Sequence, residues 1–234
     1  DGRIVIAFRG TDDSLIGWHE DFLMLCEKSV PAQESSVHFV EHIAKLSIPS
    51  SLLADLKNPF IDASLWQRFK KHFQYQKQRP LWLVGHSKGG NLAIYAACFC
   101  QTSAQKRIFQ VDNFDGPGFH DEILKSSAYR QMLPYIHSYI PHYSFFGIVL
   151  GHEENYTVVK SHETGMMQHN AFSWQLQAHH FEVDELSYES VQFAIKVILF
   201  LEKLSLEEKH QFVEAMFSLF DRLNIYNFSD LSHI

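Results

Sequence analysis

The sequence has few cysteines, no long apolar run and no excess of basic residues. Its three cysteines are odd in number and too sparse for a disulfide framework, which favours a reducing compartment and a cytoplasmic location. Cys98 and Cys100 lie in an apolar stretch, and we expect both to be buried as small hydrophobic side chains. The apolar run at residues 197–201 is far shorter than the roughly 20 residues of a membrane span, so no transmembrane segment is expected.

The charge balance argues against nucleic acid as the main partner. Lysine and arginine total 20 against 27 aspartate and glutamate residues, a net charge of −7 with neutral histidine. Eleven glycines and seven prolines, without a low-complexity tract, exclude a disordered or fibrous chain. We expect one globular domain over residues 1–234. Since the chain begins at Asp1 without an initiator methionine, we also expect preceding sequence to be missing.

Short apolar runs alternate with helical patterns along the chain. Residues 91–99 are rich in alanine, and residues 64–73 repeat apolar side chains at helical spacing. Runs that read as buried strands lie at residues 4–8, 81–84, 108–111, 136–140 and 156–159. This alternation predicts an α/β fold with a mostly parallel central sheet flanked by helices. Residues 30–62 carry proline, serine and asparagine and are expected to form an irregular or lid-like insertion.

Two helices are predicted at the C-terminal end. The first covers about residues 188–204, and the second begins after Ser205, which forms a capping box with Glu208. One face of the second helix is apolar, and we expect it to pack on the domain. That face comprises Phe212, Val213, Met216, Leu219, Phe220 and Leu223.

The motif Gly85-His86-Ser87-Lys88-Gly89-Gly90 carries the strongest functional signal. It follows an apolar strand and precedes an alanine-rich helix, which is the context of a serine nucleophile on a tight strand-to-helix turn. Glycines at this turn keep side chains out of a crowded neighbourhood. The N–H of Lys88 opens the helix and points where an oxyanion would form, so Ser87 is the candidate nucleophile and Lys88 a candidate oxyanion donor.

A second motif, Phe8-Arg9-Gly10-Thr11, ends the first strand and is followed by Gly17-Trp18. With the Ser87 motif, it resembles the class 3 lipase group of the α/β-hydrolase superfamily. Together with Asp115-Gly116-Pro117-Gly118 and Gln168-His169-Asn170, the combination resembles the bacterial Mbeg1-like family, whose domain has no assigned function. The resemblance implies an α/β-hydrolase fold and an oxyanion hole in which Thr11 is the second donor. Arg9 is expected to be structural and to pair with an acid such as Asp21.

A serine nucleophile needs a base, and fifteen histidines are available. His169 follows the last predicted strand, where the base stands in the chain order serine, acid, histidine. His86 directly precedes the nucleophile and is interpreted as a structural hydrogen-bonding residue. His38 and His42 are four residues apart, but no acidic or cysteine residue accompanies them as a further ligand. The pair is therefore weak support for a metal site. No metal or organic cofactor is implied.

The acid is less sharply defined. In class 3 lipases it belongs to a stretch whose place here is taken by Ser144, which has no charge. Asp115 ends the strand that follows the nucleophile helix and precedes His169, so it is our candidate. Its place before Gly-Pro-Gly also fits a turn-forming role. Glu153 and Glu154 are later alternatives.

These residues predict a serine hydrolase that cleaves a carboxylic ester through an acyl-enzyme, with a small-molecule or lipid ester as substrate. A thioesterase or peptidase could use the same residues. A catalytically silent hydrolase fold that binds a protein is the alternative of another class, and the uncertain acid favours it. The sequence carries no signal for an oligomeric state.

Overall fold

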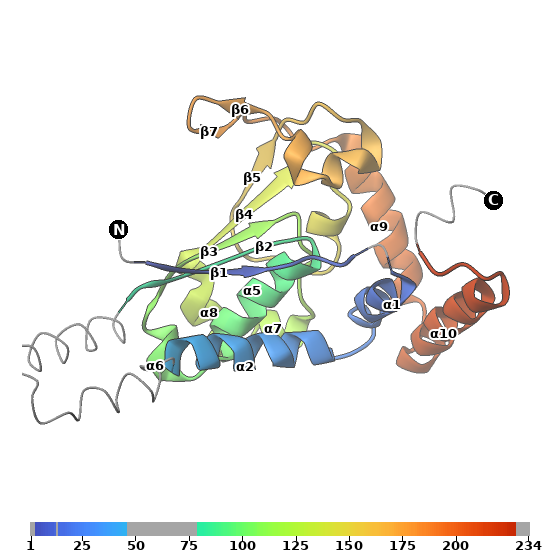
Figure 1. Cartoon of the computed structure of the whole chain (residues 1–234). Helices are drawn as coiled ribbons and strands as arrows, with labels where there is room; N and C mark the ends of the chain where they lie inside the picture. The colour runs from blue at the N-terminus through green and yellow to red at the C-terminus, as the bar shows by residue number, and fades with distance from the viewer. Residues whose placement is uncertain (1–2, 13, 46–78, 228–234) are drawn as a thin grey trace, which may run out of the picture.

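The computed structural model describes residues 3–12, 14–45 and 79–227 (Figure 1). The helix expected over residues 64–73 lies outside these ranges. No helix in the described ranges combines the length and apolarity required to cross a membrane.

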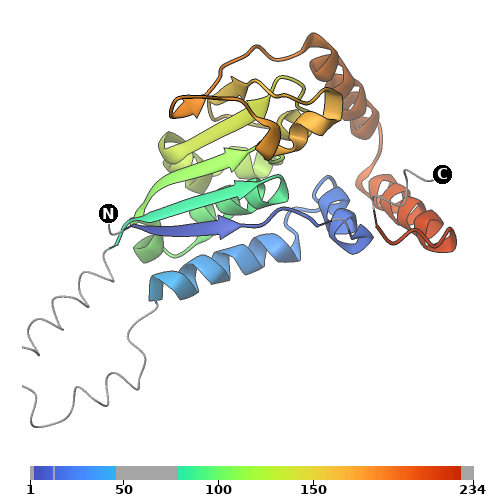
Figure 2. The ribbon, with the colours of Figure 1, turned by 45° about the horizontal axis from the view of Figure 1, so that its top comes forward.

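A five-stranded parallel sheet forms the centre of the fold, as the alternating pattern predicted, and Figure 2 shows its strands side by side. The strands are β1 (Ile4–Phe8), β2 (Leu81–His86), β3 (Ile108–Phe114), β4 (Ile136–Pro141) and β5 (Tyr156–Val159). Their order in the sheet is their order in the chain. All five carboxyl ends therefore meet at one edge, where ligands bind in open parallel sheets.

Constant strand order and right-handed crossovers bring the connecting helices to one face of the sheet. In Figure 1, α2, α5, α7 and α8 lie on that face, below the strands. The helices are α1 (Leu15–Leu23), α2 (Pro31–Lys45), α5 (Lys88–Phe99), α6 (Thr102–Gln105), α7 (Asp121–Leu124), α8 (Ser127–Met132), α9 (Tyr188–Glu202) and α10 (Leu206–Arg222). In the described ranges, 3-10 turns cover Leu133–Tyr135, Phe146–Ile148, Gly165–His169 and Ala171–Ser173.

The expectation of an irregular or lid-like insertion is wrong over residues 31–45, because these residues form helix α2. This helix packs against α5, and its Val40 is fully buried in the core. Gln33 Nε2 donates a 2.8 Å hydrogen bond to Asn91 Oδ1, and the Ser36 hydroxyl donates to the Leu92 carbonyl. The polar residues that suggested a loop thus face α5 and bond to it. Residues 46–62 lie outside the described ranges.

The other face of the sheet is covered unevenly. A small hairpin of β6 (Leu176–Gln177) and β7 (His180–Phe181) lies over β3 and β4, with the Phe181 ring 5.4 Å from that of Tyr139. Over β1 the described chain provides no such cover, and Val5 is 56% exposed. The edge strand therefore alternates between buried and exposed side chains.

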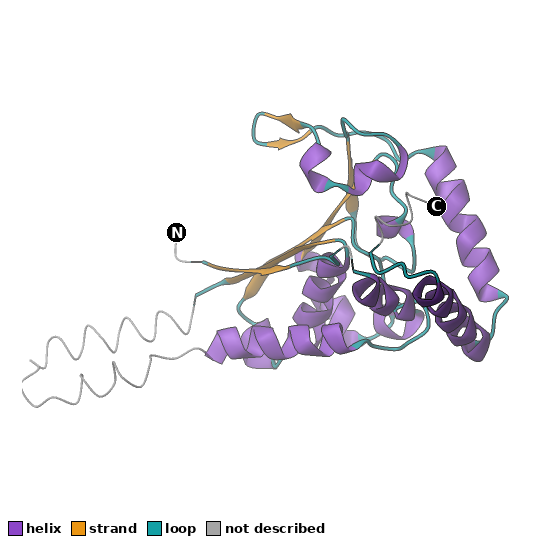
Figure 3. Cartoon of the chain, turned by 45° about the vertical axis from the view of Figure 1, so that its right-hand side comes forward, coloured by secondary structure: helices purple, strands orange, loops and turns teal. Residues whose placement is uncertain are grey.

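Helices α9 and α10 lie beyond the carboxyl edge of the sheet (Figure 3). Ser205 and Glu208 form the predicted capping box at the start of α10. The helix rests on α1, where the Phe217 ring lies 4.7 Å from that of His19. Val213 is buried, but Leu219 is 54% exposed, so the apolar face packs on the domain over only part of its length.

A buried polar cluster joins β4 to the segment that leads into β5. The Glu154 carboxylate accepts hydrogen bonds from the Tyr129 and Ser138 hydroxyls and lies 3.0 Å from His152 Nδ1. Burial alone would raise the pKa of Glu154, but the bond and charge of His152 and the bond from Tyr129 outweigh it and lower the pKa to about 2. The carboxylate form is therefore the one that the fold stabilises.

Because the pKa of Glu154 is lower in the folded chain than its ordinary 4.5, its stabilisation is complete above pH 4.5 and is lost as the pH falls toward 2. Glu154→Gln should lower the free energy of unfolding at pH 7 by about 3 kcal/mol. Urea unfolding of the parent and the variant between pH 7 and 3 measures this difference, which should shrink on acidification. The neighbouring, exposed Glu153→Gln is the control. A difference that stays constant with pH would contradict the assignment.

Candidate active site

The turn between β2 and α5 places Ser87 in a strained conformation. Its backbone has φ 56° and ψ −134°, a region that residues other than glycine rarely adopt. Close backbone packing enforces the turn, because a Cβ on Gly85 would lie 2.0 Å from the Gly89 carbonyl oxygen. Ser87 precedes α5 at the cap position, yet its side chain makes no capping hydrogen bond. The hydroxyl is therefore left available for other chemistry.

The structure brings Asp115 and His169 together at the same edge. His169 Nδ1 donates a 2.6 Å hydrogen bond to Asp115 Oδ2, and the carboxylate is almost fully buried. Asp115 also has a positive φ of 52°, at the turn that follows β3. Its other oxygen accepts hydrogen bonds from the Ser144 hydroxyl and the Gly147 N–H. With both oxygens occupied, the carboxylate has a fixed orientation toward the imidazole.

His86 holds the main chain that carries His169. Its Nε2 donates a 2.7 Å hydrogen bond to the His169 carbonyl oxygen, and the two rings lie 4.7 Å apart. Burial lowers the pKa of His86, and the charge of His169 lowers it further. Phe146 covers the His169 ring, with the ring centres 4.3 Å apart. The imidazole is thus held by a backbone bond, a carboxylate and an aromatic ring.

Within the described ranges, no hydrogen bond joins the Ser87 hydroxyl to the His169 imidazole. In structures without substrate, hydrogen bonds of this kind are commonly long or poorly aligned and tighten when substrate binds. His169 Nδ1 is bonded to Asp115, so Nε2 is the nitrogen left to exchange a proton with the serine.

The loop after β1 lies directly against the Ser87 turn. A Cβ on Gly10 would stand 2.7 Å from the His86 carbonyl oxygen and 3.2 Å from Ser87 Cβ. This brings Thr11 beside the start of α5. Among the described residues, no backbone hydrogen bond uses the N–H of Thr11 or of Lys88. Both donors are therefore free to bind an oxygen that carries developing negative charge.

The expected pairing of Arg9 with Asp21 is wrong. The Asp21 carboxylate instead accepts a hydrogen bond from the Thr11 hydroxyl and forms an ion pair with Lys88. The Arg9 side chain is exposed. The physical reason is proximity, since Lys88 extends from the Ser87 turn across to α1 and occupies the position that we had expected for the arginine.

The alternative residues lie elsewhere. Glu154 is engaged with Tyr129, Ser138 and His152, and Glu153 is exposed. His38 and His42 are exposed on α2. In the described part of the chain, no group of three or more His, Cys, Asp or Glu side chains is arranged to hold a metal ion.

An apolar cavity of about 360 Å³ opens at Ser87. Its wall is contributed by α1, the segment around Phe146 and the C-terminal helices α9 and α10. Representative lining residues are Trp18, Phe22, Phe146, Phe200, Val213 and Met216. Polar groups in the lining are concentrated at the Ser87 end, with Lys88 and Asp21, and recur as Lys209 on α10. A cavity of this composition suits an apolar acyl chain.

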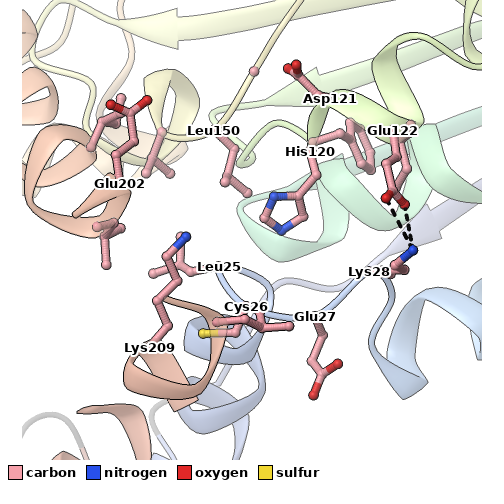
Figure 4. A pocket seen from close by; sticks show the side chains of 17 residues that line it. Leu25, Cys26, Glu27, Lys28, His120, Asp121, Glu122, Leu150, Glu202 and Lys209 are labelled. Atoms are coloured by element: carbon pink, nitrogen blue, oxygen red, sulfur yellow. Dashed lines mark hydrogen bonds and ion pairs between the residues drawn. The ribbon is translucent and has the colours of Figure 1, made fainter. Parts of the chain in front are cut away.

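A second hollow of about 610 Å³ adjoins the first, and the two share lining residues that include Leu150 and Lys209 (Figure 4). Its wall is more polar. It carries His120, whose Nε2 donates to the Met24 carbonyl, and the ion pair between Lys28 and Glu122. The apolar cavity thus leads away from Ser87 toward a charged surface.

Sequence reasoning missed three contributors to the site. Ser144 stands where the resemblance expects the acid, and it donates to the acid instead. Phe146 belongs to an apolar run at residues 145–150, the signal that could have marked it, but its contact with the His169 ring is not contained in that pattern. Nothing in the local pattern of α9 and α10 distinguishes side chains that line a cavity from side chains that pack in a core.

The expected burial of Cys98 and Cys100 is confirmed. Both are free thiols, and burial raises the pKa of each to about 12. They lie on and after α5, in the core beneath the sheet. Their position and protonation make them packing residues rather than nucleophiles.

Comparison with known proteins identifies a family. A family model described as Mbeg1-like matches residues 1–54 and 61–218, which include Ser87, Asp115 and His169 as well as the two free N–H groups. No curated protein and no solved structure matches the chain. The family match covers most of the sequence, and the chain therefore belongs to the Mbeg1-like family.

Proposed function

We propose that the protein is a serine hydrolase of the α/β-hydrolase type that cleaves a carboxylic ester. The observation that carries this proposal is the buried hydrogen bond from His169 to Asp115 at the same sheet edge as the strained Ser87 turn. The hydrogen bonds from Ser144 and Gly147 fix this buried carboxylate in the orientation in which it can hold an imidazole.

In the proposed reaction, His169 Nε2 takes the proton of the Ser87 hydroxyl as its oxygen attacks the ester carbonyl. Asp115 holds the imidazole in the correct tautomer and stabilises its protonated form. The N–H groups of Thr11 and Lys88 bind the oxyanion. His169 then returns the proton to the leaving alcohol, and an ester forms between the acyl group and Ser87. Water, activated by the same imidazole, hydrolyses this intermediate and regenerates the serine.

The apolar cavity supports an ester of an apolar acid, in the manner of a lipase or esterase. The acyl chain would extend from Ser87 between α1 and the C-terminal helices, where the wall offers mainly aliphatic and aromatic contacts. The cavity would hold the acyl part of a thioester equally well, since it contacts the part of the substrate that becomes bound to Ser87. Hydrolysis of matched oxygen esters and thioesters compares the two leaving groups.

Ser87→Ala removes the nucleophile without adding bulk and should leave the fold intact. Labelling by a fluorophosphonate probe should disappear, and turnover of p-nitrophenyl octanoate should fall by about 10⁴-fold or more. Circular dichroism and the thermal unfolding midpoint check the fold of the variant. Equal turnover by the parent and the variant would refute the proposed function.

Asp115→Asn keeps the size of the side chain but favours the wrong imidazole tautomer, so kcat should fall by about 10³- to 10⁴-fold. The matched control is Asp112→Asn on β3, the strand that leads to Asp115. The Asp112 carboxylate accepts hydrogen bonds from Trp82 and Gln110 rather than from His169. Steady-state kinetics on one ester measures both variants. If the control loses as much activity as Asp115→Asn, strand packing rather than imidazole orientation is responsible.

Met216→Trp adds bulk to the cavity wall and should change chain-length preference. Its kcat/KM for the octanoate ester should fall by about ten-fold or more relative to the acetate ester. Leu219→Trp, one turn further along α10 and exposed, is the control and should keep the parent ratio. An unchanged ratio in Met216→Trp would indicate that the acyl chain binds elsewhere.

A further inference from the structure

The side chain of Lys88 is buried, with 8% of its surface exposed, although it carries a positive charge. From the Ser87 turn it crosses to α1, where Nζ lies 2.5 Å from Glu20 Oε2 and 2.8 Å from Asp21 Oδ1. The Gly17 carbonyl oxygen is a further acceptor at 3.4 Å. The residue whose N–H opens α5 is therefore anchored by its other end to α1.

The two carboxylates bind other elements with their remaining oxygens. Asp21 Oδ2 accepts a hydrogen bond from the Thr11 hydroxyl in the loop after β1. Glu20 Oε1 accepts a 2.9 Å hydrogen bond from the Ala32 N–H at the start of α2. Asp21 is thus a direct bridge between Thr11 and Lys88, the two residues whose N–H groups are free at the site.

Stability alone is a poor reason for this cluster. Removing an ammonium and two carboxylates from water costs several kcal/mol per ion, and buried ion pairs are often no more stabilising than apolar residues of similar size. The cost is visible at Asp21, whose pKa burial raises even though the contacts of Lys88 and Thr11 lower it. A cluster retained at such a cost fixes geometry, and the geometry that it fixes is the spacing of two N–H donors.

We propose that the Lys88 ammonium and the Asp21 carboxylate are positioning groups that hold the N–H groups of Thr11 and Lys88 at the spacing that an oxyanion requires. This inference rests on the proposed function. It assigns to the Lys88 side chain a role separate from that of its own N–H. The Thr11 hydroxyl is likewise assigned to Asp21 rather than to the substrate.

The central test is Lys88→Met, which retains the N–H and much of the length of the side chain but leaves Glu20 and Asp21 without a cation. Repulsion between the two carboxylates should displace Asp21 and with it Thr11. Because oxyanion donors act in the transition state, kcat should fall by about ten-fold or more while KM changes by less than about three-fold. The matched control is Lys125→Met, which removes an exposed ion pair with Asp121 and should leave both constants unchanged.

Two further variants separate positioning from a general loss of stability. Adding Glu20→Gln to Lys88→Met removes one unpaired charge, so it should restore kcat by about three-fold or more. Asp21→Asn should lower kcat in the parent but cause little further loss in Lys88→Met, because the two groups act as one unit. Thermal unfolding midpoints, measured alongside, show whether kcat and stability change together.

The outcomes separate the two proposals. A parent that fluorophosphonate labels, together with a Lys88→Met variant of unchanged kcat, would overturn the positioning role and leave the proposed function standing. A loss of kcat that follows only the unfolding midpoint, with no rescue and additive losses, would overturn it as well. A parent that neither hydrolyses esters nor reacts with the probe would overturn the proposed function, and the positioning role with it.

Discussion

Close approach of backbones at the carboxyl ends of β1 and β2 is the constraint on which the site depends. Gly10 touches the main chain at His86, and Gly89 lies so near β1 that a Cβ would stand 2.2 Å from the Phe8 carbonyl oxygen. Without side chains at these points, the loop after β1, the Ser87 turn and the start of α5 share one small volume. The positive φ of Ser87 is a consequence of that packing. Every proposed interaction with the substrate carbonyl starts from this arrangement.

Much of the fold could be predicted because its signals are local. The run at residues 4–8 is apolar and β-branched, and four further short apolar runs alternate with helical patterns, so the parallel sheet follows from period and connection length. The capping box at Ser205 is equally local. Helix α2 was missed because its polar residues bond to α5, a contact between distant segments that a local pattern does not contain.

The candidate site likewise has features that a local pattern predicts and features that depend on contacts between distant segments. The Ser87 turn is a contiguous motif, whereas the ion pair of Lys88 with Asp21 joins residues 67 positions apart in sequence. Which cation pairs with Asp21, Lys88 or Arg9, depends on three-dimensional reach. The candidate acid shows what a sequence rule can and cannot predict. Asp115 satisfied the rule of chain order, but only the fold reveals that Ser144 supports it with a hydroxyl. That hydrogen-bonded pair supports the proposed hydrolase over a silent binding module.

Helices α9 and α10 supply much of the wall of the apolar cavity, yet none of Thr11, Ser87, Asp115 and His169 lies on them. In the proposed hydrolase, selectivity would therefore depend in part on a stretch of the chain that carries none of the proposed reacting groups. Substitutions after residue 187 can reshape the cavity, while the proposed reacting groups are held at the carboxyl edge of the sheet. In the proposed hydrolase, substitutions on these two helices could adapt the protein to new acyl groups at little cost to its chemistry.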